Sequence, residues 1–195
     1  MSLALSKLSP RTCATVVAVS AAAFLTACGS MSGGHSMSSP MSSQGKLPAS
    51  IQVPAGHKVA METVGSGDIT YECRDKANMP GQTEWVFAGP DAVLKDRAGK
   101  QVGKYYGPPA TWEAMDGSKI TGKQLAVAPA GAGNIPYQLV QANPAMGSGA
   151  MTGVTYIQRV AIQGGVAPAM ACTSSNKGQK TVVQYRADYL FWKAS

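Results

Sequence analysis

Polar and apolar side chains alternate along most of this chain, and turn-forming residues interrupt the alternation about every ten positions from Leu47 onward. Alternation with period two turns one side of an extended strand toward a core and the other side toward water. The clearest inward-facing set is Val183, Tyr185, Ala187, Tyr189 and Phe191. We therefore predict an all-β domain, built as an antiparallel β-sandwich or a flattened β-barrel.

Turn signals divide the pattern into strands. We expect turns at residues 65–68 (Gly-Ser-Gly-Asp), at residues 96–100 and at Asp116-Gly117. The first of these would separate a strand around Met61 from a second strand around Tyr71. Later in the chain, one face of a strand is predicted to carry Val154, Tyr156, Val160 and Ile162.

A secretory leader precedes the domain. Lys7 and Arg11 come before an uncharged apolar run, and the small residues of Leu25-Thr26-Ala27-Cys28 close it. The run is about 13 residues, roughly 20 Å as a helix, which is too short to span the ~30 Å core of a bilayer. We predict a lipoprotein signal peptide over residues 1–27 and lipidation of Cys28. The alternative is an ordinary signal peptide that is cut elsewhere.

The residue after Cys28 bears on location, because an Asp there is the usual signal for retention in the inner membrane. Gly29 stands in that place, so we expect a cell-envelope protein anchored through palmitate-type acyl chains in the outer membrane, facing the periplasm. Acyl chains contribute about 0.8 kcal/mol per buried methylene, and several chains hold firmly where one does not. The membrane is thus an expected partner.

Residues 28–46 are rich in Gly, Ser and Met and have little apolar surface to bury, so we predict a flexible tether. Residues 47–195 then form one β domain. The tether also contains soft metal ligands that would suit Cu(I), namely Met31, His35, Met37 and Met41. A tether without copper is the favoured interpretation, and we expect no metal and no cofactor.

Charge excludes one class of partner. The chain has 17 Lys and Arg residues, of which Lys7 and Arg11 leave with the leader, against 10 acidic residues, so the mature chain has a net charge of +5. The lysines of the mature chain are scattered and form no run of consecutive basic residues. We therefore expect no nucleic acid as a partner.

Two cysteines remain in the domain, Cys73 and Cys172. An oxidising compartment favours a disulfide between them. The alternative is a metal or redox site, which would have to work without a C-x-x-C spacing and with His57 as its sole histidine.

Catalytic motifs are incomplete. No G-x-S-x-G is present, and the glycines of residues 65–67 lack the third glycine and the following helix of a dinucleotide site. Glu113 and Asp116 beside Trp112 are the minimum equipment of a glycan hydrolase. An envelope glycan hydrolase is therefore kept as an alternative, although a non-enzymatic role is favoured.

Four aromatic residues surround Gly107-Pro108, and flat rings on a rigid rim can stack on sugars or on apolar ligands. They are Trp85, Tyr105, Tyr106 and Trp112. We predict that this rim binds a cell-wall glycan or a small apolar ligand. The competing interpretation for Trp85 and Trp112 is core packing.

A set of segments spread over nearly the whole domain resembles a family of secreted bacterial and fungal proteins known as domain of unknown function DUF3455. The segments are residues 67–73 (GDITYEC), residues 156–160 (YIQRV), residues 164–168 (GGVAP), Cys172 and residues 185–191 (YRADYLF). The resemblance implies no catalytic residues.

Together these features predict a lipid-anchored envelope protein whose disulfide-linked β domain binds a ligand or partner. A purely structural envelope protein is the remaining alternative.

Overall fold

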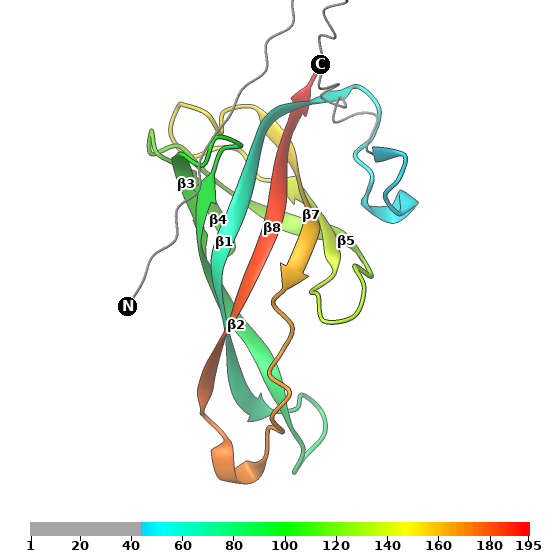
Figure 1. The fold of residues 1–195 in the computed structure, drawn as a ribbon, viewed down its shortest axis with the longest axis vertical. Coiled ribbons are helices and arrows are strands. Elements are labelled where there is room, and N and C mark those ends of the chain that lie inside the picture. Colours follow the sequence, from blue (N-terminus) through cyan, green and yellow to red (C-terminus); the bar gives the residue numbers. More distant parts are fainter. Residues whose placement is uncertain (1–43) are drawn as a thin grey trace, which may run out of the picture. The chain divides into compact units, whose positions relative to one another are not determined.

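The computed structural model describes residues 44–195, and within this range eight strands form one antiparallel sheet. The strands are β1 (His57–Asp75), β2 (Thr83–Lys95), β3 (Gln101–Tyr106), β4 (Thr111–Ala114), β5 (Lys119–Ala128), β6 (Tyr137–Ala142), β7 (Val154–Gly164) and β8 (Lys180–Ala194). Each pairs with its neighbours in sequence, and β8 pairs with β1, so the sheet closes into a barrel (Figure 1). The predicted all-β fold is confirmed. No helix in residues 44–195 has the length and apolarity to cross a bilayer.

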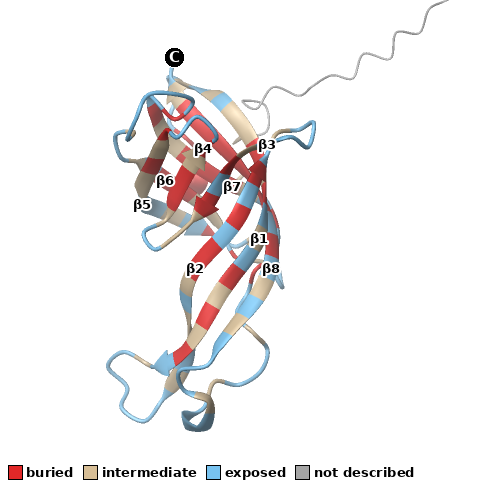
Figure 2. Cartoon of the chain, turned by 90° about the vertical axis from the view of Figure 1, so that its left-hand side faces the viewer, coloured by how far each residue is buried: buried red, intermediate tan, exposed pale blue. Residues whose placement is uncertain are grey.

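Strand β8 confirms the alternation expected from the sequence. Tyr185, Ala187, Tyr189 and Phe191 are buried in the barrel core, while Arg186 is exposed on the outer face. Figure 2 shows the same banding of buried and exposed residues along β2. The core is therefore built from the inward side of each strand, as period-two patterning requires.

The expected turn at residues 65–68 is wrong, because β1 continues through it without interruption. Its glycines serve close packing instead of chain reversal. A Cβ on Gly65 would lie 2.6 Å from Cε2 of Tyr189, and a Cβ on Gly67 would lie 2.2 Å from the carbonyl oxygen of Asp91. Glycine within a strand marks such a close approach as readily as it marks a turn.

The prediction that one face of this strand, β7, carries Val154, Tyr156, Val160 and Ile162 is also wrong. Register shifts between Val154 and Tyr156, and again between Val160 and Gln163, move residues from one face to the other. As a result Val154 packs in the barrel interior, whereas Tyr156 and Val160 pack against an apolar cluster on the outer face. Each bulge inserts a residue and so reverses the alternation beyond it.

The segment before β1 covers part of the outer face. It contains a short 3-10 helix, η1 (Ala49–Ile51), and Ile51 is completely buried in a cluster with Trp192. Gln158 of β7 donates from Nε2 to the carbonyl oxygen of Ile51 at 2.7 Å and to Oε1 of Gln44 at 3.0 Å. The chain therefore enters the domain along the outside of the barrel. The rest of the predicted tether lies outside the described residues.

Three strands extend beyond the barrel as an arm, made of residues 68–75 of β1, 83–90 of β2 and 180–184 of β8 (Figure 1). β3 pairs with β2 only from Asp91 onward, so these residues of β2 have β1 as their partner. Cys73 in the arm forms a disulfide with Cys172, which confirms the predicted bridge; their Cα atoms are 5.4 Å apart. The bridge holds a second short 3-10 helix, η2 (Ser174–Asn176), and its flanking loop against the end of the arm.

Candidate functional site

The structure separates the four aromatic residues predicted to form one rim. Tyr105 of β3 and Trp112 of β4 are cross-strand partners inside the barrel, 4% and 1% exposed, with stacked rings 4.6 Å apart. Trp85 lies on the arm, where its indole Nε1 donates to the carbonyl oxygen of Met170 at 2.7 Å. Tyr106 alone of the four lies beside a surface groove. Ligand binding by these residues stays a prediction, and they do not share one surface.

That groove, of about 590 Å³, lies where the arm leaves the barrel. Its lining includes residues from four strands and one turn: Thr70, Asp91, Lys104, Tyr106, Pro108 and Lys180. The turn after β3 lies directly against β2, since a Cβ on Gly89 would be 2.3 Å from the carbonyl oxygen of Gly107. The peptide bonds before Pro108 and Pro109 are cis. Gly89 thus permits the turn to form one wall of the groove.

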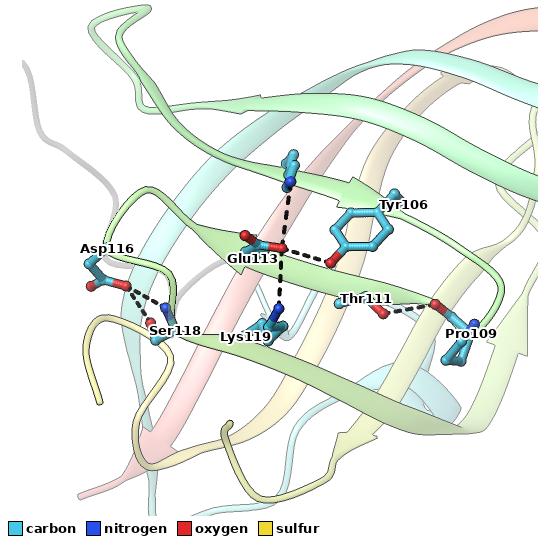
Figure 3. A network of polar contacts seen from close by, with 8 residues as sticks. Tyr106, Pro109, Thr111, Glu113, Asp116, Ser118 and Lys119 are labelled. Atoms are coloured by element: carbon cyan, nitrogen blue, oxygen red, sulfur yellow. Dashed lines mark hydrogen bonds and ion pairs between the residues drawn. The ribbon is translucent and has the colours of Figure 1, made fainter. Parts of the chain in front are cut away.

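An acidic residue outside the groove fixes the Tyr106 ring. The Tyr106 hydroxyl donates to Oε2 of Glu113 at 2.7 Å, and the Nζ atoms of Lys104 and Lys119 lie 3.6 Å and 3.9 Å from the same oxygen (Figure 3). The hydrogen bond from Tyr106, followed by the two lysines, lowers the pKa of Glu113. The same bond raises the pKa of Tyr106, so its hydroxyl stays protonated as the donor. Glu113 therefore acts as an ionised acceptor that positions its neighbours.

Asp116 has a different task, in the turn between β4 and β5. Its carboxylate accepts hydrogen bonds from Oγ of Ser118 at 2.6 Å and from N of Ser118 at 2.9 Å (Figure 3). It also accepts a hydrogen bond from N of Ala150 at 2.7 Å. These bonds, led by the Ser118 hydroxyl, lower the pKa of Asp116. A glycan hydrolase needs one carboxyl group whose pKa is raised so that it can act as a general acid. The surroundings of Glu113 and Asp116 instead lower the pKa values of both carboxyl groups.

The groove itself has an excess of positive charge. Lys104 and Lys180 contribute two ammonium groups against the one carboxylate of Asp91. Glu113, outside the groove, offsets part of the charge of Lys104. The Nζ atom of Lys104 lies 5.1 Å from the centre of the Tyr106 ring. Among residues 44–195, neither Lys180 nor Asp91 forms an ion pair with any other residue. The arrangement can therefore bind a ligand that carries an anionic group next to a flat or hydroxyl-bearing surface.

Sequence reasoning did not identify Thr70, Asp91 or Lys180 as groove residues. They lie on three different strands and have no common motif, so no local signal could have grouped them. Lipidation of Cys28 and copper binding by Met31, His35, Met37 and Met41 concern residues outside the described part of the chain. In the described part, no group of three or more His, Cys, Asp or Glu residues is arranged to hold a metal ion.

Comparison with known proteins identifies a family and nothing beyond it. A family model described as "Protein of unknown function (DUF3455)" matches residues 54–193, from the segment before β1 to the end of β8. Neither the curated proteins nor the solved structures contain a match to this chain.

Proposed function

Because this chain belongs to the DUF3455 family, whose description assigns no activity, we propose its function from the groove beside Tyr106. The protein is a lipid-anchored cell-envelope protein that binds an anionic glycan of the cell wall without chemically changing it. The observation that carries this proposal is the presence of two lysines and a fixed tyrosine ring in one groove of about 590 Å³.

The composition of the groove favours a charged sugar over the small apolar ligand that the sequence also allowed. Sugar rings stack on aromatic faces, and their hydroxyl groups suit the polar side chains of Thr70 and Asp91. A carboxylate on the sugar would gain charge-assisted hydrogen bonds from Lys104 or Lys180. An apolar ligand would instead cover these ammonium groups without replacing their contacts with water.

Binding is tested with two disaccharides that differ in charge. We expect N-acetylglucosaminyl-N-acetylmuramic acid, which carries a carboxylate, to bind in isothermal titration calorimetry, and the neutral N,N′-diacetylchitobiose to bind at least tenfold more weakly. Lys180→Met should weaken binding of the acidic sugar about tenfold, the loss of one charge-assisted hydrogen bond. Tyr106→Ala should weaken binding of both sugars, because both would use the ring.

Lys123→Met is the matched control for this experiment, because Lys123 is an exposed lysine of β5 outside the groove lining. An equal loss of affinity in this control would point to general charge attraction and contradict the proposed site. Equal affinity of the wild type for the two disaccharides, or no binding of either at millimolar concentration, would also refute it.

The lipid anchor is tested separately, by feeding cells an alkyne-labelled palmitate and detecting the label on the purified protein. We expect the wild type to be labelled and Cys28→Ala to be unlabelled, because Cys28 is the thiol at the predicted cleavage site. Cys13→Ala removes the cysteine of the leader and should leave labelling intact. A label that survives in Cys28→Ala would exclude this anchor, and fractionation of labelled cells would report which membrane holds the protein.

A further inference from the structure

A polar cluster occupies the barrel interior around Tyr189, a fully buried residue in the middle of β8. Its cross-strand neighbours are Thr63 on β1 and Arg159 on β7. The rings of Tyr105 and Trp112 pack against Tyr189, with centres 5.2 Å and 6.1 Å from its own. Five strands therefore contribute to this cluster, which is separate from the surface groove.

Three buried polar atoms of this cluster have no hydrogen-bond partner among the described residues. Nη2 of Arg159 donates to the carbonyl oxygen of Pro136 at 2.9 Å, yet its Nε is buried and has no partner among the described residues. The indole Nε1 of Trp112 and Oγ1 of Thr63 are also buried and have no partner among the described residues. Buried polar atoms without a partner are rare in folded proteins, and several in one interior indicate that an acceptor belongs there.

The positive charge of Arg159 is also uncompensated. The side chain is only 9% exposed, and no carboxylate of residues 44–195 forms an ion pair with it. The nearby tyrosines do not replace a carboxylate: burial raises the pKa of Tyr105, Tyr185 and Tyr189, so all three are neutral at physiological pH. A buried arginine normally has an anionic partner.

The cross-strand neighbour of Arg159 on β6 is polar and contacts an exposed side chain. Arg159 lies opposite Gln138 in the sheet, and Nε2 of Gln138 donates to Oε1 of the exposed Gln124 at 2.6 Å. The Pro136 carbonyl that accepts from Arg159 belongs to the loop just before β6. On this side of the barrel, polar side chains therefore connect the neighbourhood of Arg159 with the surface.

We propose that Arg159 is the centre of an oxyanion-binding site inside the barrel, which takes the carboxylate or phosphate group of a small ligand. The planar guanidinium offers paired donors to two oxygens of such a group, and the buried setting strengthens the attraction because water screens it less than at the surface. The interior is filled largely by aromatic and aliphatic side chains. This packing excludes a long-chain ligand.

The test is a titration of the full-length protein in neutral detergent with sodium acetate, sodium benzoate or inorganic phosphate, with chloride keeping the ionic strength constant. At a hundredfold excess over Kd, a bound anion should raise the Tm by about 5 °C and then saturate. Quenching or a shift of tryptophan fluorescence should follow the same curve, because Trp112 belongs to the cluster. If only phosphate has an effect, the ligand is an inorganic anion. If benzoate has a stronger effect than acetate, the ligand is an aromatic acid.

Variants distinguish this site from a merely structural arginine. Arg159→Met should abolish the anion-dependent rise, and without anion it should be no less stable than the wild type, because it removes an unpaired buried charge. Should that variant fail to fold, Arg159→Lys keeps the charge without the planar fork and should bind about tenfold more weakly. Lys123→Met, which removes an exposed lysine of β5 outside the groove, should respond like the wild type. No saturable response to any of the three anions, or an undiminished response in the Arg159 variant that folds, would overturn the proposal.

Discussion

Replacing both Cys73 and Cys172 by alanine is expected to lower the free energy of unfolding by about 4–5 kcal/mol, which corresponds to a fall in Tm of about 10 °C or more. The bridge closes a loop of 99 residues in sequence. Without it the unfolded chain gains a large conformational entropy, and entropy of the unfolded state is what a disulfide chiefly removes. Urea denaturation followed by circular dichroism measures the change.

Reduction of the wild type supplies the control for that experiment, because it breaks the same bond without removing side-chain atoms. Reduced wild type and the double variant should have similar midpoints. Cys73 is fully buried, so a further loss in the double variant alone would report lost packing. A double variant with the midpoint of the oxidised wild type would contradict the stabilising role of the bridge.

Trp112→Ala is expected to cost about 3–5 kcal/mol of stability, the range for removal of a large buried aromatic side chain. Trp112 is 1% exposed and stacks on Tyr105 inside the barrel. Removing the indole leaves a cavity that the closed sheet cannot easily fill, because β4 is hydrogen-bonded on both sides. Thermal denaturation monitored by circular dichroism gives the Tm, which should fall by about 10 °C.

Trp85→Ala is the matched comparison, because Trp85 is a half-buried tryptophan of the arm. Its removal should lower the Tm clearly less than removal of Trp112. If Trp112→Ala instead kept the wild-type Tm while losing ligand, Trp112 would belong to a binding surface and the description of it as core would be wrong.

Much of the fold could be predicted from local patterns. The alternation in β8 and the reversal at residues 96–100 followed directly from residue type, because each concerns neighbours within a few positions. The glycines of residues 65–68 could not be interpreted in that way. Their role depends on Asp91 of β2 and Tyr189 of β8, which meet them only when these strands pair with β1.

The candidate site was predicted only in part, for the same reason. Tyr106 and the turn after it could be named from the sequence, since aromatic residues beside Gly-Pro stand out locally. Tyr105 and Trp112, whose side chains face inward, could not be assigned to the core or to the rim from the sequence. Alternation separates the two faces of a strand but does not say which face turns inward. Arg159 is a charged residue two positions after Ile157, and only the register of β7 shows that Ile157 faces inward.

The order of residues by itself determined an all-β domain, because alternation is a property of each strand alone. It also named the one pair of domain cysteines that could form a bridge. Tertiary structure decided that the sheet closes into a barrel, which face of β7 turns inward and which side chains meet in the groove and around Tyr189. Those outcomes depend on strand register and on contacts between residues far apart in the chain, and a one-residue shift in register reverses every side chain that follows.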